Sequence, residues 1–274
     1  MGVLDMEIEE CQERYQDKLS MIFVGGLSPL AMKGHPYRCK RDEELCHGKC
    51  RFDNIDIRKK VIKKLLTMHY KAHSGHIGSS LSCVDILINL FFNVMKDEDI
   101  FVLSPGHKAS ALYAVLWAKG VILDEEIETY YKDGTRLTAH PPCNKQICNI
   151  IFGTGSLGHG LSISIGIASV TKGQVYCLLS EGDCQEGQTH EAALFIKQHK
   201  IKNLHIIVDK NQLQGLGDVN DILNVDDFIS SLPNCTVVHT VKGDGVSFME
   251  HDYRWHYLPM NKEQYEIAMG EVDI

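Results

Sequence analysis

The chain has 274 residues, of which 44% are hydrophobic, so it is long enough for one large domain with a substantial core. Its formal net charge of −8 argues against a nucleic-acid partner, which would require a basic face. The apolar stretches are too short to cross a bilayer and the first ten residues are acidic, unlike a secretory signal. We therefore expect no membrane partner and a cytoplasmic location.

Residues 1–52 lack sustained hydrophobic periodicity, and we expect them to form an N-terminal extension to a domain that covers residues 53–274. The extension contains three cysteines and a histidine that together could bind a structural zinc ion in a tetrahedral arrangement. These residues are Cys39, Cys46, Cys50 and His47. Their spacing is not that of paired C-x-x-C knuckles, so thiols without a ligand and redox chemistry remain alternatives.

Strand-like and helical stretches alternate along the rest of the sequence. In chain order, the expected elements are a helix at 54–74, a helix at 83–94, a strand at 100–103, a helix at 109–119, a loop entering a helix at 153–173, a strand at 175–180, a helix at 189–200, strands at 204–209 and 236–241, and a helix at 262–269. This alternation favours an α/β fold, with a parallel sheet flanked by helices. In the segment 153–173, Gly160, Ser164 and Ala168 recur every four positions and predict a helix face that another backbone can approach closely.

Acidic and amide side chains follow two neighbouring strands of this predicted sheet. LLSEGDCQEG (178–187) begins at the end of one strand, and VDKNQLQG (208–215) begins at the end of the next. Ligands of open parallel sheets collect at the carboxyl ends of the strands. Oxygen atoms from these two loops could coordinate a hard cation, Mg²⁺ or Ca²⁺, that bridges a diphosphate.

These two loops resemble the thiamine-diphosphate motif of the transketolase family, which runs Gly-Asp-Gly, about thirty residues and then Asn. Aligned on the downstream Gln-Glu-Gly at 185–187, the motif falls on 180–182, so that Glu181 takes the place of the family's Asp. The resemblance implies Glu181 and Asn211 as side-chain metal ligands and Leu213 as a ligand through its backbone carbonyl. Asp183 is the alternative carboxylate ligand, and its spacing to Asn211 fits less well.

Four further segments resemble transketolase loops in the family's order: HSGHIGSSLS (73–82), LSPGHKASALYA (103–114), AHPP (139–142) and TVKGDGVSFMEHDYRWHY (240–257). Each carries a histidine that the resemblance places at the active site, namely His76, His107, His140 and His256. His107 is expected beside the diphosphate. Clustered imidazoles with pKa values near neutrality could exchange protons with sugar hydroxyls.

The resemblance extends to the cofactor's other contacts. GTGSLGHGLS (153–162) resembles the loop whose residues Gly155, Ser156 and Leu157 contact the cofactor. Gly182 and Asp183 are expected beside the diphosphate, and Glu186 matches a carboxylate of the acidic network that links paired active sites.

Three positions depart from the family pattern. Ser180 replaces a glycine, Pro105 stands where Lys or Asn is more usual, and Tyr257 replaces a usual glycine.

The resemblance implies a thiamine-diphosphate-dependent enzyme that moves a two-carbon ketol unit from a ketose, or its phosphate, to an aldose. It also implies a partner: a separate C-terminal transketolase subunit that supplies the pyrimidine-binding domain, in a heterotetramer with two copies of each chain. Two alternatives remain open. One is a transketolase-like enzyme of a specialised sugar or natural-product pathway with another donor, and the other is a non-catalytic regulatory subunit.

Overall fold

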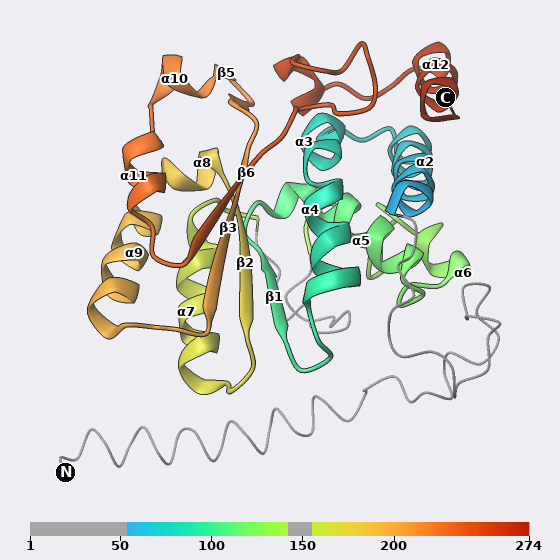
Figure 1. Cartoon of the computed structure of the whole chain (residues 1–274). Coiled ribbons are helices and arrows are strands. Elements are labelled where there is room, and N and C mark those ends of the chain that lie inside the picture. Colours follow the sequence, from blue (N-terminus) through green and yellow to red (C-terminus); the bar gives the residue numbers. More distant parts are fainter. Residues whose placement is uncertain (1–53, 142–154, 274) are drawn as a thin grey trace.

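The computed structural model describes residues 54–141 and 155–273 (Figure 1). The expected N-terminal extension and its candidate zinc ligands lie outside these residues, and so does part of the AHPP segment. Within the described ranges, no helix combines the length and the apolar character that crossing a membrane would need.

Four parallel strands form the central sheet, in the spatial order β1–β2–β3–β6. They are β1 (Ile100–Leu103), β2 (Val175–Ser180), β3 (Leu204–Lys210) and β6 (Cys235–His239). Because every pairing is parallel, the carboxyl ends of the strands lie at one edge of the sheet. Ser180 pairs with Asp209, so the loops that begin at Glu181 and Asn211 leave the sheet side by side.

Helices cover both faces of the sheet (Figure 1). One face is covered by α2 (Asn54–Ala72), α3 (Ile77–Ser82), α4 (Val84–Asn89) and α5 (Ala109–Ala118), and the other by α7 (His159–Val170), α9 (Gly187–His199) and α11 (Asp226–Ser231). The C-terminal helix α12 (Lys262–Asp273) packs on α2. The expected parallel sheet between two helical layers is confirmed.

Short elements complete the described chain. They are the π-helical turn η2 (Leu90–Val94), the 3₁₀ turns η3 (Gly106–Lys108) and η4 (Tyr253–His256), the helical turns α6 (Asp124–Ile127), α8 (Glu181–Cys184) and α10 (Val219–Ile222), and a hairpin of β4 (Leu213–Gln214) and β5 (Gly217–Asp218).

Strands β1, β2 and β3 are mostly buried, whereas every residue of the edge strand β6 is half-buried or exposed. Successive side chains of a strand point to opposite faces of the sheet. In β1, Phe101 and Leu103 pack into the cluster under α2 and α5, whereas Ile100 and Val102 pack into the cluster under α7 and α9. Strands β1, β2 and β3 are therefore mostly apolar, as is typical of a parallel sheet covered on both faces.

The predicted small-residue face is confirmed. Gly160, Ser164 and Ala168 are all buried on the inner side of α7. A Cβ atom on Gly160 would lie 2.4 Å from the Cβ of Ser104, just after β1, so only glycine allows this approach.

Two predicted boundaries differ from the structure. The expected helix at 83–94 ends as α4 at Asn89 and continues as a π turn, closed by a 2.8 Å bond from Met95 N to Leu90 O. The segment 73–82, expected as a loop, forms α3 over its second half, where every residue from Ile77 to Ser82 is buried against the rest of the protein.

Candidate active site

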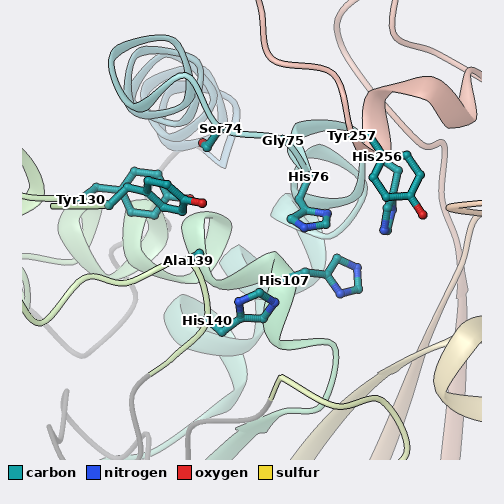
Figure 2. Close-up of a pocket in the computed structure, with 10 residues that line it drawn as sticks. Ser74, Gly75, His76, His107, Tyr130, Ala139, His140, His256 and Tyr257 are labelled. Carbon is teal, nitrogen blue, oxygen red and sulfur yellow. The ribbon is translucent and has the colours of Figure 1, made fainter. Parts of the chain in front are cut away.

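Four imidazoles from four separate segments converge on one cavity of about 170 Å³ (Figure 2). His76 precedes α3, His107 lies in η3, His140 follows α6 in the chain, and His256 ends η4. Ring centroids lie 4.7 Å apart for His76 and His256, 5.2 Å for His76 and His107, and 6.2 Å for His76 and His140. The histidines predicted from four sequence motifs therefore form a single group.

His76 is held in an unusual backbone conformation at the centre of this group. Its φ of +69° lies in the left-handed region, which is uncommon for a residue other than glycine. The carbonyl of His256 accepts a 2.9 Å hydrogen bond from His76 N–H. A Cβ on the preceding Gly75 would lie 2.8 Å from the carbonyl oxygen of Tyr257, so the segments of His76 and His256 pack backbone to backbone. Such strain persists where the surrounding structure fixes the conformation.

The four histidines are neutral at physiological pH. Burial is the main cause: it lowers the pKa of His76 to about 4 and that of His256 to about 3. Burial also lowers the pKa of His107 well below its ordinary value, and it lowers that of His140. The pKa values near neutrality that the sequence suggested are therefore wrong for these buried rings, because desolvation disfavours the charged form. A neutral imidazole offers one donor and one acceptor nitrogen, so the cavity can both give and accept hydrogen bonds.

One polar atom of this group lacks a partner within the described part of the chain. The Nδ1 atom of His76 is buried and forms no hydrogen bond there, whereas His256 Nδ1 lies 3.2 Å from the hydroxyl of Ser79. Buried polar atoms are normally hydrogen-bonded, so an unsatisfied one at a cavity indicates a place for a ligand.

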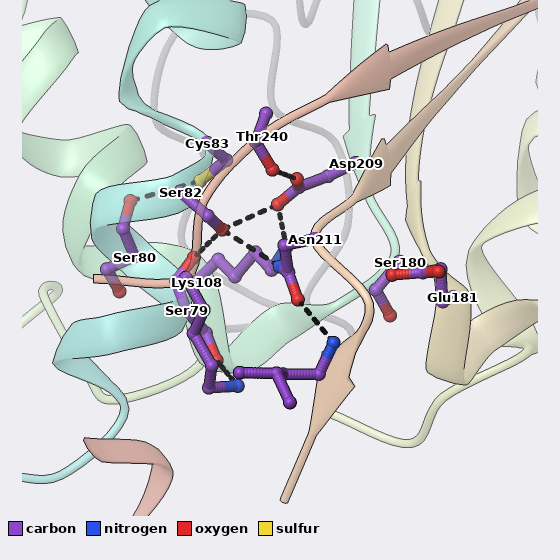
Figure 3. A network of polar contacts seen from close by, with 12 residues as sticks. Ser79, Ser80, Ser82, Cys83, Lys108, Ser180, Glu181, Asp209, Asn211 and Thr240 are labelled. Carbon is purple, nitrogen blue, oxygen red and sulfur yellow. Dashed lines mark hydrogen bonds and ion pairs between the residues drawn. The ribbon is translucent and has the colours of Figure 1, made fainter. Parts of the chain in front are cut away.

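The second group of predicted residues lies at the carboxyl edge of the sheet (Figure 3). Glu181 is buried, and its Oε2 accepts a 2.6 Å hydrogen bond from the backbone N–H of Gln212. Burial raises the pKa of Glu181, and the hydrogen bond from Gln212 opposes that shift. Asn211 Oδ1 accepts a 3.1 Å hydrogen bond from the N–H of Leu213. The two predicted side-chain ligands thus come from adjacent loops that contact each other.

Asp183 has a different environment. Its Oδ1 accepts hydrogen bonds from Ser104 Oγ at 2.6 Å and from Gly158 N at 3.0 Å, and its Oδ2 accepts them from the N–H and the hydroxyl of Ser180. Ser180 and Asp183 form a capping box around the first turn of α8. Both carboxylate oxygens of Asp183 therefore accept hydrogen bonds that hold the start of α8 in place, which explains Ser180 in place of a glycine. This structural role of Asp183 leaves Glu181, which contacts the Asn211 loop, as the better candidate ligand.

A buried ionic network positions Asn211, and the sequence analysis missed it. Lys108 and Asp209, 1% and 0% exposed, form an ion pair. Asp209 also accepts hydrogen bonds from Thr240 Oγ1 and, at 2.7 Å, from Ser82 Oγ. Ser82 Oγ in turn accepts one from Asn211 Nδ2 at 3.3 Å. Asp209 thereby orients the Asn211 amide through Ser82 (Figure 3).

The remaining residues predicted to contact the cofactor, or to link paired active sites, are mostly exposed. Gly155 and Ser156 are exposed, and the Leu157 side chain packs against Gly182. Glu186 is also exposed and does not line the histidine cavity. Its predicted role in a network between paired sites concerns a second copy of the chain and stays a prediction.

The described residues contain no group of three or more His, Cys, Asp or Glu side chains arranged to hold a metal ion. The Mg²⁺ site expected from the sequence is of another kind, because it would use one carboxylate, one amide and one backbone carbonyl, with further oxygens from the cofactor's diphosphate. Mg²⁺ commonly binds in this way, through one or two protein groups and substrate phosphates. Glu181, Asn211 and Leu213 therefore provide oxygen atoms suited to a cation that also binds the oxygens of a diphosphate.

A comparison with protein families identifies the family of this chain. Residues 58–242 match the family model described as transketolase, thiamine diphosphate binding domain. The chain belongs to the transketolase family. The matched range contains Glu181, Asn211 and three of the four cavity histidines, while His256 lies beyond it.

Some relatives in this family are named as enzyme subunits. This transketolase-family chain is 34% identical over 255 residues to a protein of Phocaeicola vulgatus that is named as one subunit of apulose-4-phosphate transketolase, covering 77% of this chain and 90% of the relative. It is 29% identical over 259 residues to the 6-deoxy-6-sulfo-D-fructose transketolase subunit SqwG of a Clostridium species, covering 78% of this chain and 94% of the relative.

Solved structures show the same fold. The transketolase of Leishmania mexicana superposes with a TM-score of 0.70 at 18% identity, covering 80% of this chain and 41% of that one. The described fold is therefore that of a transketolase domain, and the chain spans about two fifths of that structure's length.

Proposed function

We propose that this chain is the thiamine-diphosphate-binding subunit of a transketolase that transfers a two-carbon ketol unit from a ketose, or its phosphate, to an aldose. The observation that carries the proposal is the meeting of four neutral histidines at one cavity. Glu181 and Asn211, at the carboxyl edge of the sheet, are suited to binding a cation and a diphosphate. They lie near that cavity. The cofactor would supply the carbanion chemistry that breaks and forms the carbon–carbon bond.

The chain's own residues would hold the cofactor and manage protons. Glu181, Asn211 and the Leu213 carbonyl would bind Mg²⁺ or Ca²⁺, with Asp183 as the alternative carboxylate. The neutral rings of His76, His107, His140 and His256 would donate to and accept from the hydroxyls and the carbonyl of the sugar. Because burial keeps these rings uncharged, each can offer one donor and one acceptor nitrogen to the sugar, and the rings do not repel one another.

A second polypeptide is part of the proposal. In transketolases a carboxylate of the second domain activates the cofactor, and we infer that another chain supplies it here; the described lining of the histidine cavity contains no Asp or Glu. Gly155 and Ser156, on the predicted cofactor loop, are exposed and free to be covered. The Phocaeicola relative is named as one subunit of its enzyme, which supports a C-terminal partner for this chain. We propose a heterotetramer with two copies of each chain.

The donor is proposed only as a class. The relatives named for apulose-4-phosphate and 6-deoxy-6-sulfo-D-fructose favour a specialised ketose, and Tyr257 at the cavity wall narrows the site where a glycine is usual. Apulose-4-phosphate, 6-deoxy-6-sulfo-D-fructose and common ketose phosphates are the donors to screen first.

The test is reconstitution. The chain is co-expressed with a candidate C-terminal partner of the transketolase family, and the complex is assayed for aldose-dependent consumption of each ketose with thiamine diphosphate and Mg²⁺ present. We expect turnover by the complex and none by either chain alone. Normal cofactor binding by a complex that consumes no ketose would contradict the reaction. Absence of cofactor binding with and without Mg²⁺ would favour the alternative of a regulatory subunit.

A further inference from the structure

Leu213, whose backbone carbonyl is a predicted cation ligand, lies in a hairpin that is too short to be stable by itself. The hairpin consists of β4 and β5, in which Leu213 pairs with Asp218 and Gln214 pairs with Gly217. Even longer two-stranded hairpins are marginally stable in water unless they pack against other parts of a protein. The orientation of the Leu213 carbonyl therefore depends on the contacts that hold this hairpin.

Side chains from distant segments support the hairpin. Gln214 Nε2 donates a 3.0 Å hydrogen bond to Oε1 of Gln185, the residue that follows α8. At the tip of the hairpin, the phenol of Tyr257 lies against Gly215. A Cβ on Gly215 would lie 2.5 Å from the Tyr257 hydroxyl oxygen and 2.9 Å from Cδ2 of His256. A larger residue at position 215 would therefore push one of these rings away.

The segment that carries His256 positions Tyr257 for this contact. Tyr257 N–H donates a 3.0 Å hydrogen bond to the carbonyl of Arg254 in η4. The Tyr257 carbonyl packs on Gly75, as described above. The Tyr257 ring meets the imidazole of His256 edge to face, with centroids 4.9 Å apart (Figure 2). The backbone of Tyr257 is thus fixed beside the histidine cavity, while its phenol rests on the hairpin.

Tyr257 therefore connects the two parts of the candidate site. It lines the histidine cavity and also touches the hairpin that contains Leu213. A glycine, which is usual at this position in the family, has no side chain that could reach the hairpin. Groups that orient the ligands of a metal ion, without touching the ion, commonly change its affinity ten- to a hundredfold.

We propose that Tyr257 is a positioning residue for the cation site. Its ring holds the hairpin of β4 and β5 in place and thereby fixes the Leu213 carbonyl as a ligand of the cation that Glu181 and Asn211 would also bind. The proposal rests on the proposed function. It assigns to the packing of one aromatic ring a part of the affinity for the cation, and it requires no hydrogen bond from the Tyr257 hydroxyl.

The test measures the Mg²⁺ requirement of cofactor binding by the full-length chain, alone or with the partner used for reconstitution. Calorimetric titrations with thiamine diphosphate at several Mg²⁺ concentrations give the concentration for half-maximal binding. Tyr257→Ala should raise this concentration about tenfold or more, because the hairpin loses its support. Tyr257→Phe keeps the ring and should stay within about twofold of the wild type. An unchanged Mg²⁺ requirement in Tyr257→Ala would overturn the proposal.

Tyr253→Ala is the matched control. It removes another exposed phenol from the same turn η4, and Tyr253 is not among the described residues that line the cavity. The Mg²⁺ requirement should stay within about twofold of the wild type. An equal rise in Tyr253→Ala and Tyr257→Ala would show a general loosening of η4 and overturn the assigned contact. A loss in Tyr257→Phe as large as in Tyr257→Ala would assign the effect to the hydroxyl and also overturn it.

Gly215→Ala tests the same contact from the side of the hairpin. Its new Cβ should displace the Tyr257 ring and raise the Mg²⁺ requirement, as Tyr257→Ala does. The double variant should raise it by less than the product of the two separate fold-changes, because both substitutions remove one shared contact. Fold-changes that simply multiply would mean that the two residues act independently, and would overturn the proposal.

Folding is monitored by the melting temperature without ligand. Tyr257→Ala should melt close to the wild type, because Tyr257 is 59% exposed. If it does not fold, Tyr257→Leu gives the same comparison with a side chain too short to cover Gly215. A wild type that binds no thiamine diphosphate with Mg²⁺ present would contradict the proposed function itself. A raised KM for the ketose with an unchanged Mg²⁺ requirement in Tyr257→Ala would assign the ring to the sugar and overturn only the positioning role.

Discussion

The carboxylate of Glu181 accepts a 2.6 Å hydrogen bond from the backbone N–H of Gln212, across the gap between the ends of β2 and β3. Gln212 has a φ of +65°, so the chain turns sharply between Asn211 and Leu213, whose N–H donates a 3.1 Å hydrogen bond to Asn211 Oδ1. The longer side chain of glutamate, compared with the family's aspartate, spans this gap. This hydrogen bond ties together the two loops that would hold the cation.

Glu181 and Asp183 should respond differently to neutralisation. Asp183→Asn disrupts a capping box and four accepted hydrogen bonds, and should lower the free energy of unfolding by about 1–3 kcal/mol. Glu181→Gln removes a buried charge and should change stability little, but should reduce Mg²⁺-dependent binding of thiamine diphosphate. Urea unfolding and calorimetry measure the two effects. Loss of Mg²⁺ dependence in a well-folded Asp183→Asn, with Glu181→Gln unaffected, would make Asp183 the ligand.

Asn211→Ala should weaken cofactor retention in the presence of Mg²⁺ roughly ten- to a hundredfold, because the cation loses one of about six oxygen ligands. The melting temperature should change little, since the bonds of the Asn211 amide are a long one of 3.3 Å to Ser82 and a local one to Leu213. Retention is measured by dialysing the cofactor-loaded protein. Asn93→Ala is the control, because it removes an exposed amide that lies far from Asn211 in the sequence. Unchanged retention in Asn211→Ala would remove this residue from the site.

His76→Asn should lower the turnover of the reconstituted complex by about 10²–10⁴-fold while leaving cofactor affinity within a few fold. Asparagine tolerates the positive φ at this position, so the variant tests the imidazole rather than the backbone. His73→Asn is a matched control, because His73 also has a positive φ but is exposed. Equal activity of the two variants would exclude His76 from the chemistry.

The ligand-free chain should lose stability as the pH falls below about 6.5. Burial lowers the pKa of His69 to about 4, so the unfolded chain takes up a proton that the folded chain does not. The stabilising contribution is complete above the unfolded pKa and declines as the pH falls towards the folded one. Between pH 6.5 and 5 this histidine alone should account for about 2 kcal/mol. Chemical unfolding at several pH values measures the slope, and His69→Gln should reduce it; an unchanged slope would contradict the assignment.

Gly160→Ala should destabilise the fold by about 1–3 kcal/mol, because the new Cβ would lie 2.4 Å from the Cβ of Ser104. Gly166→Ala on the same helix should stabilise it by about 0.5–1 kcal/mol, since the added Cβ would meet no described atom within 4 Å outside its own helix backbone and alanine favours the helix. Thermal unfolding of the two variants gives the comparison. A shift of the same sign in both would mean that close packing of α7 on β1 does not decide the cost.

Much of the site was predictable from residue order alone. Glycines, histidines and polar loop residues at family spacing indicated His76, His107, His140 and His256 before any coordinates. The alternation of strands and helices indicated the parallel sheet, because hydrophobic periodicity is a local property of the chain. Even the small face of α7 follows from a four-residue repeat.

Tertiary structure alone decided the electrostatics. The sequence presents Lys108, Asp209 and Lys242 as ordinary charged residues, and only folding shows that all three are buried and that Lys242 lacks a counter-charge among the described residues. The choice between Glu181 and Asp183 likewise depends on which carboxylate other segments have already engaged. Burial and pairing depend on residues distant in the chain, so no local pattern can encode them.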